Sequence, residues 1–379
     1  MRILHTSDWH LGKKIFGVSL IDIQKDILNQ LLNTLINKKV ELLLISGDIF
    51  DRAIPPVEAL ILLNDFLLKI REIKGLNTVI ISGNHDNRNR LGFLSDFLRS
   101  DNIFIRTSLV NSDKPLYFED SNGKIAVYTF PFAEETEYRE LLDLNNGSYG
   151  MSEWVFKIKE DMDKNIRNIA MGHTMLVGGI ESDSERIINV GGEVGIDVSC
   201  FSGFNYVAMG HLHRRQKIKE EYIMYSGSLY KYSFSEANNR KAFLFIEMDS
   251  KGIINKTEIK YNLIRDLKVI KGDFKEIENN AYNNPNQKDF IKVILTDKEP
   301  IIDPMLRLKV YYPNLLMIER EYLKNKDASI KSQKSIDKLS NKELIEQFYK
   351  TVYEDELNEK QKAFLYELLE KTGDAYNEN

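Results

Sequence analysis

The sequence predicts an α/β fold in which two packed β-sheets are flanked by helices. Its first hundred residues alternate between short apolar runs and stretches with helical spacing, an order typical of a layered sheet. Five further short apolar segments follow before residue 250, and two sheets packed face to face accommodate that many strands. Apolar residues make up 42% of the chain and aromatic residues 10%, which allows a sizeable core and excludes global disorder.

Each strand is predicted from a short apolar run and each helix from apolar spacing. Residues 41–46 form a continuous apolar run of the buried-strand type, whereas residues 21–37 place Ile27, Leu31 and Leu35 on one helical face. The expected strands are 2–6, 41–46, 78–82, 125–130, 169–172, 206–209, 222–225 and 242–247. The expected helices between the first strands are 21–37, 56–70 and 93–98.

These strands and helices form a first domain, which we place at residues 1–263. The sequence pattern changes after it. Residues 264–323 alternate again and predict a small α/β capping domain. Residues 324–338 are polar and suit a linker. Residues 339–379 carry apolar stripes with charged opposite faces, which predict two amphipathic helices. These helices suit a docking element, and the alternative is a tail that folds back on its own core.

Charge and cysteine content limit the possible functions. The chain has 52 basic and 57 acidic residues, a net charge of -5, which excludes a binder acting by bulk positive charge but not a local basic groove. Cys200 is the one cysteine, so an intrachain disulfide framework is impossible and a reducing compartment is favoured. No secretory signal and no membrane-spanning run is visible, and we expect a cytoplasmic protein.

Five of the six histidines lie in short motifs that follow apolar strands. Carboxylate and amide oxygens with imidazole nitrogens are a ligand set for divalent first-row metals such as Mn and Fe. The absence of cysteine from every motif argues against a structural zinc cluster. The motif residues with ligand atoms are Asp8, His10, Asp48, Asp51, Asn84, His85, Asp86, His173, His211 and His213.

Each motif alone is explained as well by an ordinary turn. All of them together, each at the end of an apolar strand, predict a metal site at the carboxyl ends of the strands, where open α/β sheets bind ligands. His5 lies inside the first strand, and we interpret it as a buried core histidine.

The order of these motifs resembles that of the calcineurin-like metallophosphoesterases. The opening residues 1–12, MRILHTSDWHLG, are similar to those of the double-strand-break repair nucleases within that superfamily. Residues 182–186, 225–229 and 233–236 add to the match. The resemblance is strong over about 260 residues from Met1 and continues more weakly to the C-terminal helices.

This resemblance implies a centre of two divalent metal ions, expected to be Mn²⁺, that hydrolyses a phosphodiester. It assigns Asp8, His10 and His213 to one ion. It assigns Asn84, His173 and His211 to the other, with Asp48 as the bridge.

The resemblance also assigns three catalytic residues. His85 corresponds to the histidine that protonates the leaving oxygen or stabilises the transition state. Asp51 stands where phosphatases of the superfamily place a carboxylate that orients this histidine, and Arg52 stands where they place a phosphate-binding arginine. The glycine that follows in those phosphatases is Ala53 here, and an ordinary loop salt bridge is the alternative for Asp51 and Arg52.

Basic residues beside the motifs suit a track for a DNA backbone, although a chance distribution is the alternative. They are Lys13, Lys14, Arg52, Arg88, Arg90, Arg214 and Arg215. The helix at residues 57–72 is apolar around most of its circumference. It is either a fully covered core helix or, as the resemblance favours, the interface of a homodimer.

The resemblance therefore predicts a DNA exonuclease and endonuclease subunit. Its partner would be a coiled-coil ATPase that docks on the C-terminal helices. One alternative is a stand-alone phosphodiesterase or phosphatase, which would need neither the capping domain nor the tail. Another is a metal-free binding scaffold, although every expected ligand is present.

Overall fold

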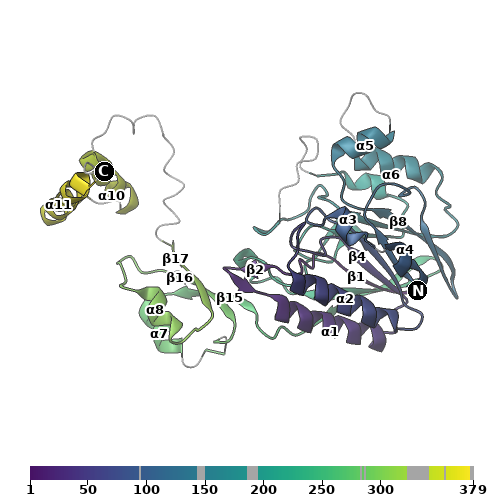
Figure 1. Cartoon of the computed structure of the whole chain (residues 1–379), viewed down its shortest axis with the longest axis horizontal. Helices are drawn as coiled ribbons and strands as arrows, with labels where there is room; N and C mark the ends of the chain where they lie inside the picture. Colours follow the sequence, from purple (N-terminus) through teal and green to yellow (C-terminus); the bar gives the residue numbers. More distant parts are fainter. Residues whose placement is uncertain are drawn as a thin grey trace. The chain divides into compact units, whose positions relative to one another are not determined.

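The computed structural model describes residues 1–93, 95–142, 150–185, 195–281, 284–285, 287–321, 341–353 and 356–375. The chain divides into two compact units, Met1–Leu267 and Lys268–Asn379 (Figure 1). The predicted linker at residues 324–338 lies outside the described residues. No helix in the described ranges is long and apolar enough to cross a membrane.

The first unit contains two large sheets, as the sequence predicts, and each has six strands, four more in total than the eight that were expected. The strand order of the first sheet is β14 (Gly252–Lys260), β13 (Ala242–Asp249), β1 (Arg2–Thr6), β4 (Leu42–Ser46), β5 (Asn77–Ile81) and β6 (Ile103–Arg106). The last four of these strands run parallel to one another, whereas β13 is antiparallel to β1, and β14 is antiparallel to β13. The order of the second is β11 (Gln216–Ile218), β12 (Glu220–Tyr225), β10 (Tyr206–Gly210), β9 (Arg167–His173), β8 (Gly123–Phe130) and β7 (Leu116–Asp120).

The two sheets pack face to face around one apolar core. Leu44 and Val79 of the first sheet join Val127, Ile169 and Ala208 of the second in a single buried cluster. Strand β4 is apolar at four of its five positions and β5 at its last three, because both faces of these strands are covered. The sandwich therefore brings the carboxyl ends of strands from both sheets to the same edge of the unit.

Helices cover the outer faces of the sandwich. Helix α1 (Ile21–Asn37) buries Ile27, Leu31 and Leu35 at the predicted spacing. Helices α1 and α2 lie along the first sheet (Figure 1). A second buried cluster joins the other face of the second sheet to α5 and α6. The remaining elements of this unit are α2 (Val57–Arg71), α3 (Arg88–Leu91), α4 (Ser95–Leu98), α5 (Glu135–Leu142), α6 (Met151–Glu160), the hairpin β2 (Lys14–Ile15) and β3 (Val18–Ser19), and 3₁₀ turns at Arg99–Asp101, Val198–Phe201 and Phe234–Glu236.

Helix α2 buries only one of its two apolar faces. Leu63 and Phe66 are buried, whereas Ile61 is 54% exposed and Leu68 is 50% exposed. The single chain thus does not give the fully covered core helix that was one interpretation of this segment. An apolar cavity of about 220 Å³ lies beside this helix, lined in part by Leu60, Leu67 and Leu68.

The second unit contains a small three-stranded sheet and four helices among its described residues. Its core includes Phe274, Val293 and Leu308. Its strands lie in the order β15 (Leu267–Gly272), β16 (Phe290–Leu295) and β17 (Leu315–Arg320), with helices α7 (Phe274–Asn280) and α8 (Pro304–Lys309). The predicted C-terminal helices are α10 (Asn341–Tyr353) and α11 (Glu359–Ala375).

Candidate metal centre

The strand ends bring the predicted ligand residues into one buried cluster. Asp8 and Asp48 follow the parallel strands β1 and β4 of the first sheet, and Asn84 follows β5. His173 ends β9 of the second sheet, and His211 follows β10. Because the strands within each sheet are parallel here and the sheets are packed together, their carboxyl ends meet.

The loops after β1 and β4 hold these side chains in an unusual backbone conformation. Asp8, His10 and Asp48 have φ angles of 52°, 44° and 51°, in the left-handed region that non-glycine residues seldom adopt. The backbone N–H of Asp8 donates to the backbone carbonyl of Gly47 at 3.0 Å, and that of His10 donates to the backbone carbonyl of Asp48 at 2.9 Å. The two loops therefore fix each other, and strain of this kind is concentrated at functional sites.

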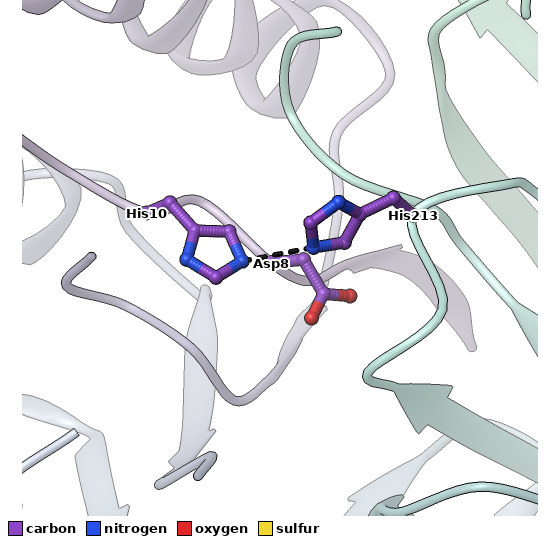
Figure 2. Close-up of side chains that lie close together, drawn as sticks. All are labelled: Asp8, His10 and His213. Atoms are coloured by element: carbon purple, nitrogen blue, oxygen red, sulfur yellow. Dashed lines mark hydrogen bonds between the residues drawn. The ribbon is translucent and has the colours of Figure 1, made fainter. Parts of the chain in front are cut away.

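Asp8, His10 and His213 form the first group of ligand atoms (Figure 2). The Nε2 atoms of His10 and His213 lie 3.0 Å apart. The carboxylate of Asp8 accepts the backbone N–H of His211 at 3.0 Å and the hydroxyl of Ser7 at 2.5 Å. These contacts orient the carboxylate within the same small volume as the two rings.

Asp48 lies between this group and a second one. Its Oδ2 is 3.6 Å from Nε2 of His10 and 3.5 Å from Nε2 of His173. Nε2 of His173 also lies 3.1 Å from Oδ1 of Asn84. One carboxylate oxygen thus faces imidazoles from both sheets, as a bridging ligand must.

The donor set fits divalent cations better than it fits internal hydrogen bonds. Nδ1 of His173 donates to the carbonyl of Ser46 at 2.8 Å, so Nε2 is the ring nitrogen left to face a cation. Burial lowers the pKa of His173, but the charge of Asp48 raises it to about 9, so a cation bound to Nε2 would take the place of the proton there. Within the described residues, Nε2 of His211 is buried without a hydrogen-bond partner. Buried polar atoms are rarely left unpaired in native proteins, and a cation would satisfy such a nitrogen.

The charges of the cluster depend strongly on one another. Burial raises the pKa of Asp8, against the charges of His173 and His213. Burial would also raise the pKa of Asp48, but the charge and hydrogen bond of His173 hold it well below its ordinary value. Burial lowers the pKa of His211 to about 3, so that imidazole is neutral and able to bind a metal.

His85 lies at the rim of this cluster and contacts both Asp48 and Asp51. Its backbone N–H donates to Oδ1 of Asp48 at 2.9 Å, and its Nδ1 donates to the backbone carbonyl of Asp51 at 2.7 Å. The Asp51 carboxylate instead accepts from Lys13 at 2.7 Å. Asp51 thus contacts the His85 ring through its main-chain carbonyl, while its carboxylate pairs with Lys13 and also lies in a group of possible ligand atoms with His10 and His85. Arg52 is exposed and has no ion pair with a described residue.

Asp86 is a buried carboxylate whose role the sequence did not indicate. It accepts hydrogen bonds from the backbone N–H groups of Ile49, Phe50 and Gly83 at 2.9 to 3.1 Å. It thereby ties the loop after β4 to the loop after β5. Burial, followed by the charge of Asp48, raises its pKa to about 7. Its only sequence signal is its place directly after Asn84 and His85.

His213 is held by several residues that were not predicted as site residues, among them Ser184, Glu185, Glu236 and Lys241. The contacts come from residues 184–185, after β9, and from Glu236 and Lys241, before β13. Burial would raise the pKa of Glu236, but the charge of Lys241 holds it well below its ordinary value. Residues 182–185 and 233–236 were noted only as similar to a family, and they have no metal-ligand pattern of their own.

The structure divides the basic residues near the motifs into two classes. Arg88 makes a bidentate pair with Glu137, and Arg215 pairs with Glu258. Lys13 pairs with Asp51. Of the seven basic residues near the motifs, four are exposed and form no ion pair with a described residue: Lys14, Arg52, Arg90 and Arg214.

The chain matches known proteins over most of its length. Residues 1–215 match the model of the calcineurin-like phosphoesterase family, and residues 264–353 match that of the type 5 capsule protein repressor C-terminal domain. The chain is 32% identical over 372 residues to the SbcD subunit of the nuclease SbcCD from Staphylococcus epidermidis, and the match covers 97% of this chain and 98% of the relative.

Two solved structures resemble the chain more distantly. A dimetal phosphatase from Danio rerio has a TM-score of 0.41 and 12% identity, covering 69% of this chain and 99% of its own. GAP50, the anchor in the inner membrane complex of Plasmodium, has a TM-score of 0.36 and 13% identity, covering 69% and 89%.

Proposed function

The chain belongs to the calcineurin-like phosphoesterase family and is a homologue of the SbcD nuclease subunit, and from this membership we propose that it is a two-metal DNA nuclease subunit. It would degrade duplex ends as an exonuclease and cleave single-stranded and hairpin DNA as an endonuclease. It would act in the cytoplasm, with an SbcC-type coiled-coil ATPase, in the repair and recombination of broken DNA.

The observation that carries this proposal is the cluster of ligand side chains at the strand ends. Asp8, His10 and His213 would hold one ion. Asn84, His173 and His211 would hold the other, with Asp48 between them. Two bound ions, in our proposal Mn²⁺, would neutralise phosphate charge and acidify a water molecule that attacks phosphorus.

His85 is our candidate for the acid that assists departure of the 3′ oxygen. Its Nδ1 proton is committed to the Asp51 carbonyl, so the neutral ring presents Nε2 as its second titratable position. That atom lies 3.9 Å from Oδ2 of Asp48, beside the ligand cluster rather than within the first group. A proton on Nε2 would be transferred to the leaving oxygen as the bond to phosphorus breaks.

The DNA backbone would follow the exposed basic side chains that lack an intramolecular partner. Arg52 follows the loop that carries Asp48 and Asp51, and Arg214 directly follows His213. An unpaired guanidinium can bind a phosphate without first losing an ion pair. We therefore assign phosphate contacts to Arg52 and Arg214 before Arg88 and Arg215.

Two apolar surfaces support the proposed partners. Phe348 of α10 and Phe364 of α11 are 64% and 63% exposed, which suits docking of these helices on the ATPase. The exposed face of α2, with Ile61 and Leu68, suits a two-fold homodimer.

A nuclease assay with defined substrates tests the proposal. The purified chain would be incubated with Mn²⁺ and labelled duplex, hairpin or single-stranded DNA, with and without the ATPase. We expect metal-dependent cleavage of single-stranded DNA by the chain alone, and ATP-stimulated degradation of duplex ends by the complex. Hydrolysis of small phosphodiesters without cleavage of any DNA would instead support a stand-alone phosphodiesterase.

A further inference from the structure

A chain of buried polar contacts lies behind His213, on the side of the ring away from His10. Nδ1 of His213 is 2.6 Å from Oγ of Ser184, and that hydroxyl donates to Oε1 of Glu236 at 2.6 Å. Oε2 of Glu236 accepts from Nζ of Lys241, also at 2.6 Å. Glu236 is 0% exposed and Lys241 is 8% exposed, so water screens these contacts little.

The directions of these hydrogen bonds fix the tautomer of His213. A carboxylate paired with a buried ammonium can only accept, so the Ser184 hydroxyl proton is committed to Glu236. The Ser184 oxygen must then accept the proton on Nδ1 of His213. Nε2 of the neutral ring is left with its lone pair, and it faces Nε2 of His10.

The main chain of His213 is held by the same surroundings. Its carbonyl accepts from Nζ of Lys241 at 2.9 Å, and its N–H donates to Oε1 of Glu185 at 2.6 Å. Both the position and the rotation of the ring are therefore set by residues that are not ligands themselves.

His173, on the other side of Asp48, has a different support. Its Nδ1 donates to the backbone carbonyl of Ser46, which carries no net charge. Nδ1 of His213, in contrast, is linked through Ser184 to the carboxylate of Glu236. Such a link makes the opposite imidazole nitrogen more basic and therefore a stronger metal ligand. Loss of a partner of this kind usually lowers metal affinity about 10–100-fold. The two sides of the cluster are thus unequal.

We propose that Ser184, Glu236 and Lys241 are positioning residues for His213, and that they make the metal position of Asp8, His10 and His213 the tighter of the two. The inference rests on the two-metal centre proposed above. Fold stability is a weak alternative explanation of the Glu236–Lys241 pair, because buried ion pairs often add little net stability.

Calorimetric titration of the full chain with Mn²⁺ tests this inference. The wild type should bind two ions in unequal steps. Ser184→Ala should weaken the tighter step about 10–100-fold and leave the weaker step unchanged. Ser184→Thr, which keeps the hydroxyl, should restore the tighter step. Asn84→Ala should weaken only the other step.

A nearby serine provides the matched control. The hydroxyl of Ser235 accepts the N–H of Asp183 and contacts Ser233, outside the chain of contacts to His213. Ser235→Ala should leave both binding steps unchanged, whereas Glu236→Gln should weaken the tighter step as Ser184→Ala does. Unchanged binding in Ser184→Ala would overturn the inference, and so would an equal loss in both steps or in the Ser235→Ala control.

The titration also separates this inference from the proposed nuclease function. A chain that binds two ions unequally but cleaves no DNA would refute the nuclease function and leave the role of Ser184 standing. A chain that cleaves DNA but binds its ions equally would do the reverse.

Discussion

Nε2 of His10 and Nε2 of His213 lie 3.0 Å apart, although 203 residues separate them in the sequence. One residue follows the first strand of one sheet, and the other follows β10 of the second sheet. Packing of the two sheets is therefore what creates this pair of ligand atoms.

We expect Asp48→Ala to lose bound metal and to abolish DNA cleavage. Oδ2 of Asp48 faces Nε2 of His10 and Nε2 of His173, so the substitution removes one ligand from each proposed ion. It also removes the negative charge that would reduce the repulsion between the two cations. Metal analysis of the purified variant, together with the nuclease assay, checks this. Two bound ions with full activity would refute the bridging role.

We expect His85→Ser to bind metal and DNA normally but to cleave at least about 10²-fold more slowly. The side chain acts only when charge develops on the leaving oxygen, so binding of the ground state survives its removal. Single-turnover cleavage rates and metal content would be measured together. Loss of one ion would show that His85 is a ligand.

Asp51→Ala should slow cleavage less than His85→Ser does. The contact with Nδ1 of His85 comes from the Asp51 backbone carbonyl, which alanine retains, whereas the lost carboxylate pairs with Lys13. The same single-turnover assay compares the two variants. Equal losses would mean that the Asp51 carboxylate is needed for the chemistry.

Arg214→Ala and Arg88→Ala should differ in their effect on DNA binding. Arg214 is exposed without an ion pair to a described residue, and its loss should weaken binding and lower the salt slope of log K by about 1. Arg88 is committed to Glu137, so its loss should leave the salt slope unchanged and cost about 1 kcal/mol of stability or less. DNA affinities at several salt concentrations, with thermal unfolding, distinguish these outcomes. The same change of slope in both variants would contradict the assignment.

Removal of residues 339–379 should leave a folded, Mn²⁺-dependent nuclease that no longer binds its ATPase partner. Helices α10 and α11 contain none of the proposed ligands, and they expose Phe348 and Phe364. The shortened chain should still cleave single-stranded DNA but lose ATP-stimulated degradation of duplex ends. Co-purification with the ATPase measures the docking directly. Undiminished complex formation would move the docking role to residues 264–323.

The sequence by itself determined the α/β class, eight of the twelve strands in the two large sheets and the residue types at the strand ends, but not strands β6, β7, β11 and β14. These features are local, because a strand such as β4 is recognised from its own apolar run and Asp48 from its place just beyond it. The family match could be recognised for the same reason, since its motifs are short and contiguous. Residues 264–323 were also recognisable as a separate α/β module from their own alternation.

Only the tertiary structure decided which polar groups support these residues. Ser184 meets His213 across 29 positions of the chain, and Arg88 meets Glu137 across 49. No periodicity in the sequence encodes such a pair, because it depends on how separate loops pack and on which rotamers they allow. The same reason applies to Asp51, whose backbone carbonyl accepts from Nδ1 of His85. The sequence shows that Asp51 has a carboxylate, but it does not show whether the carboxylate or the main chain will contact a neighbouring residue.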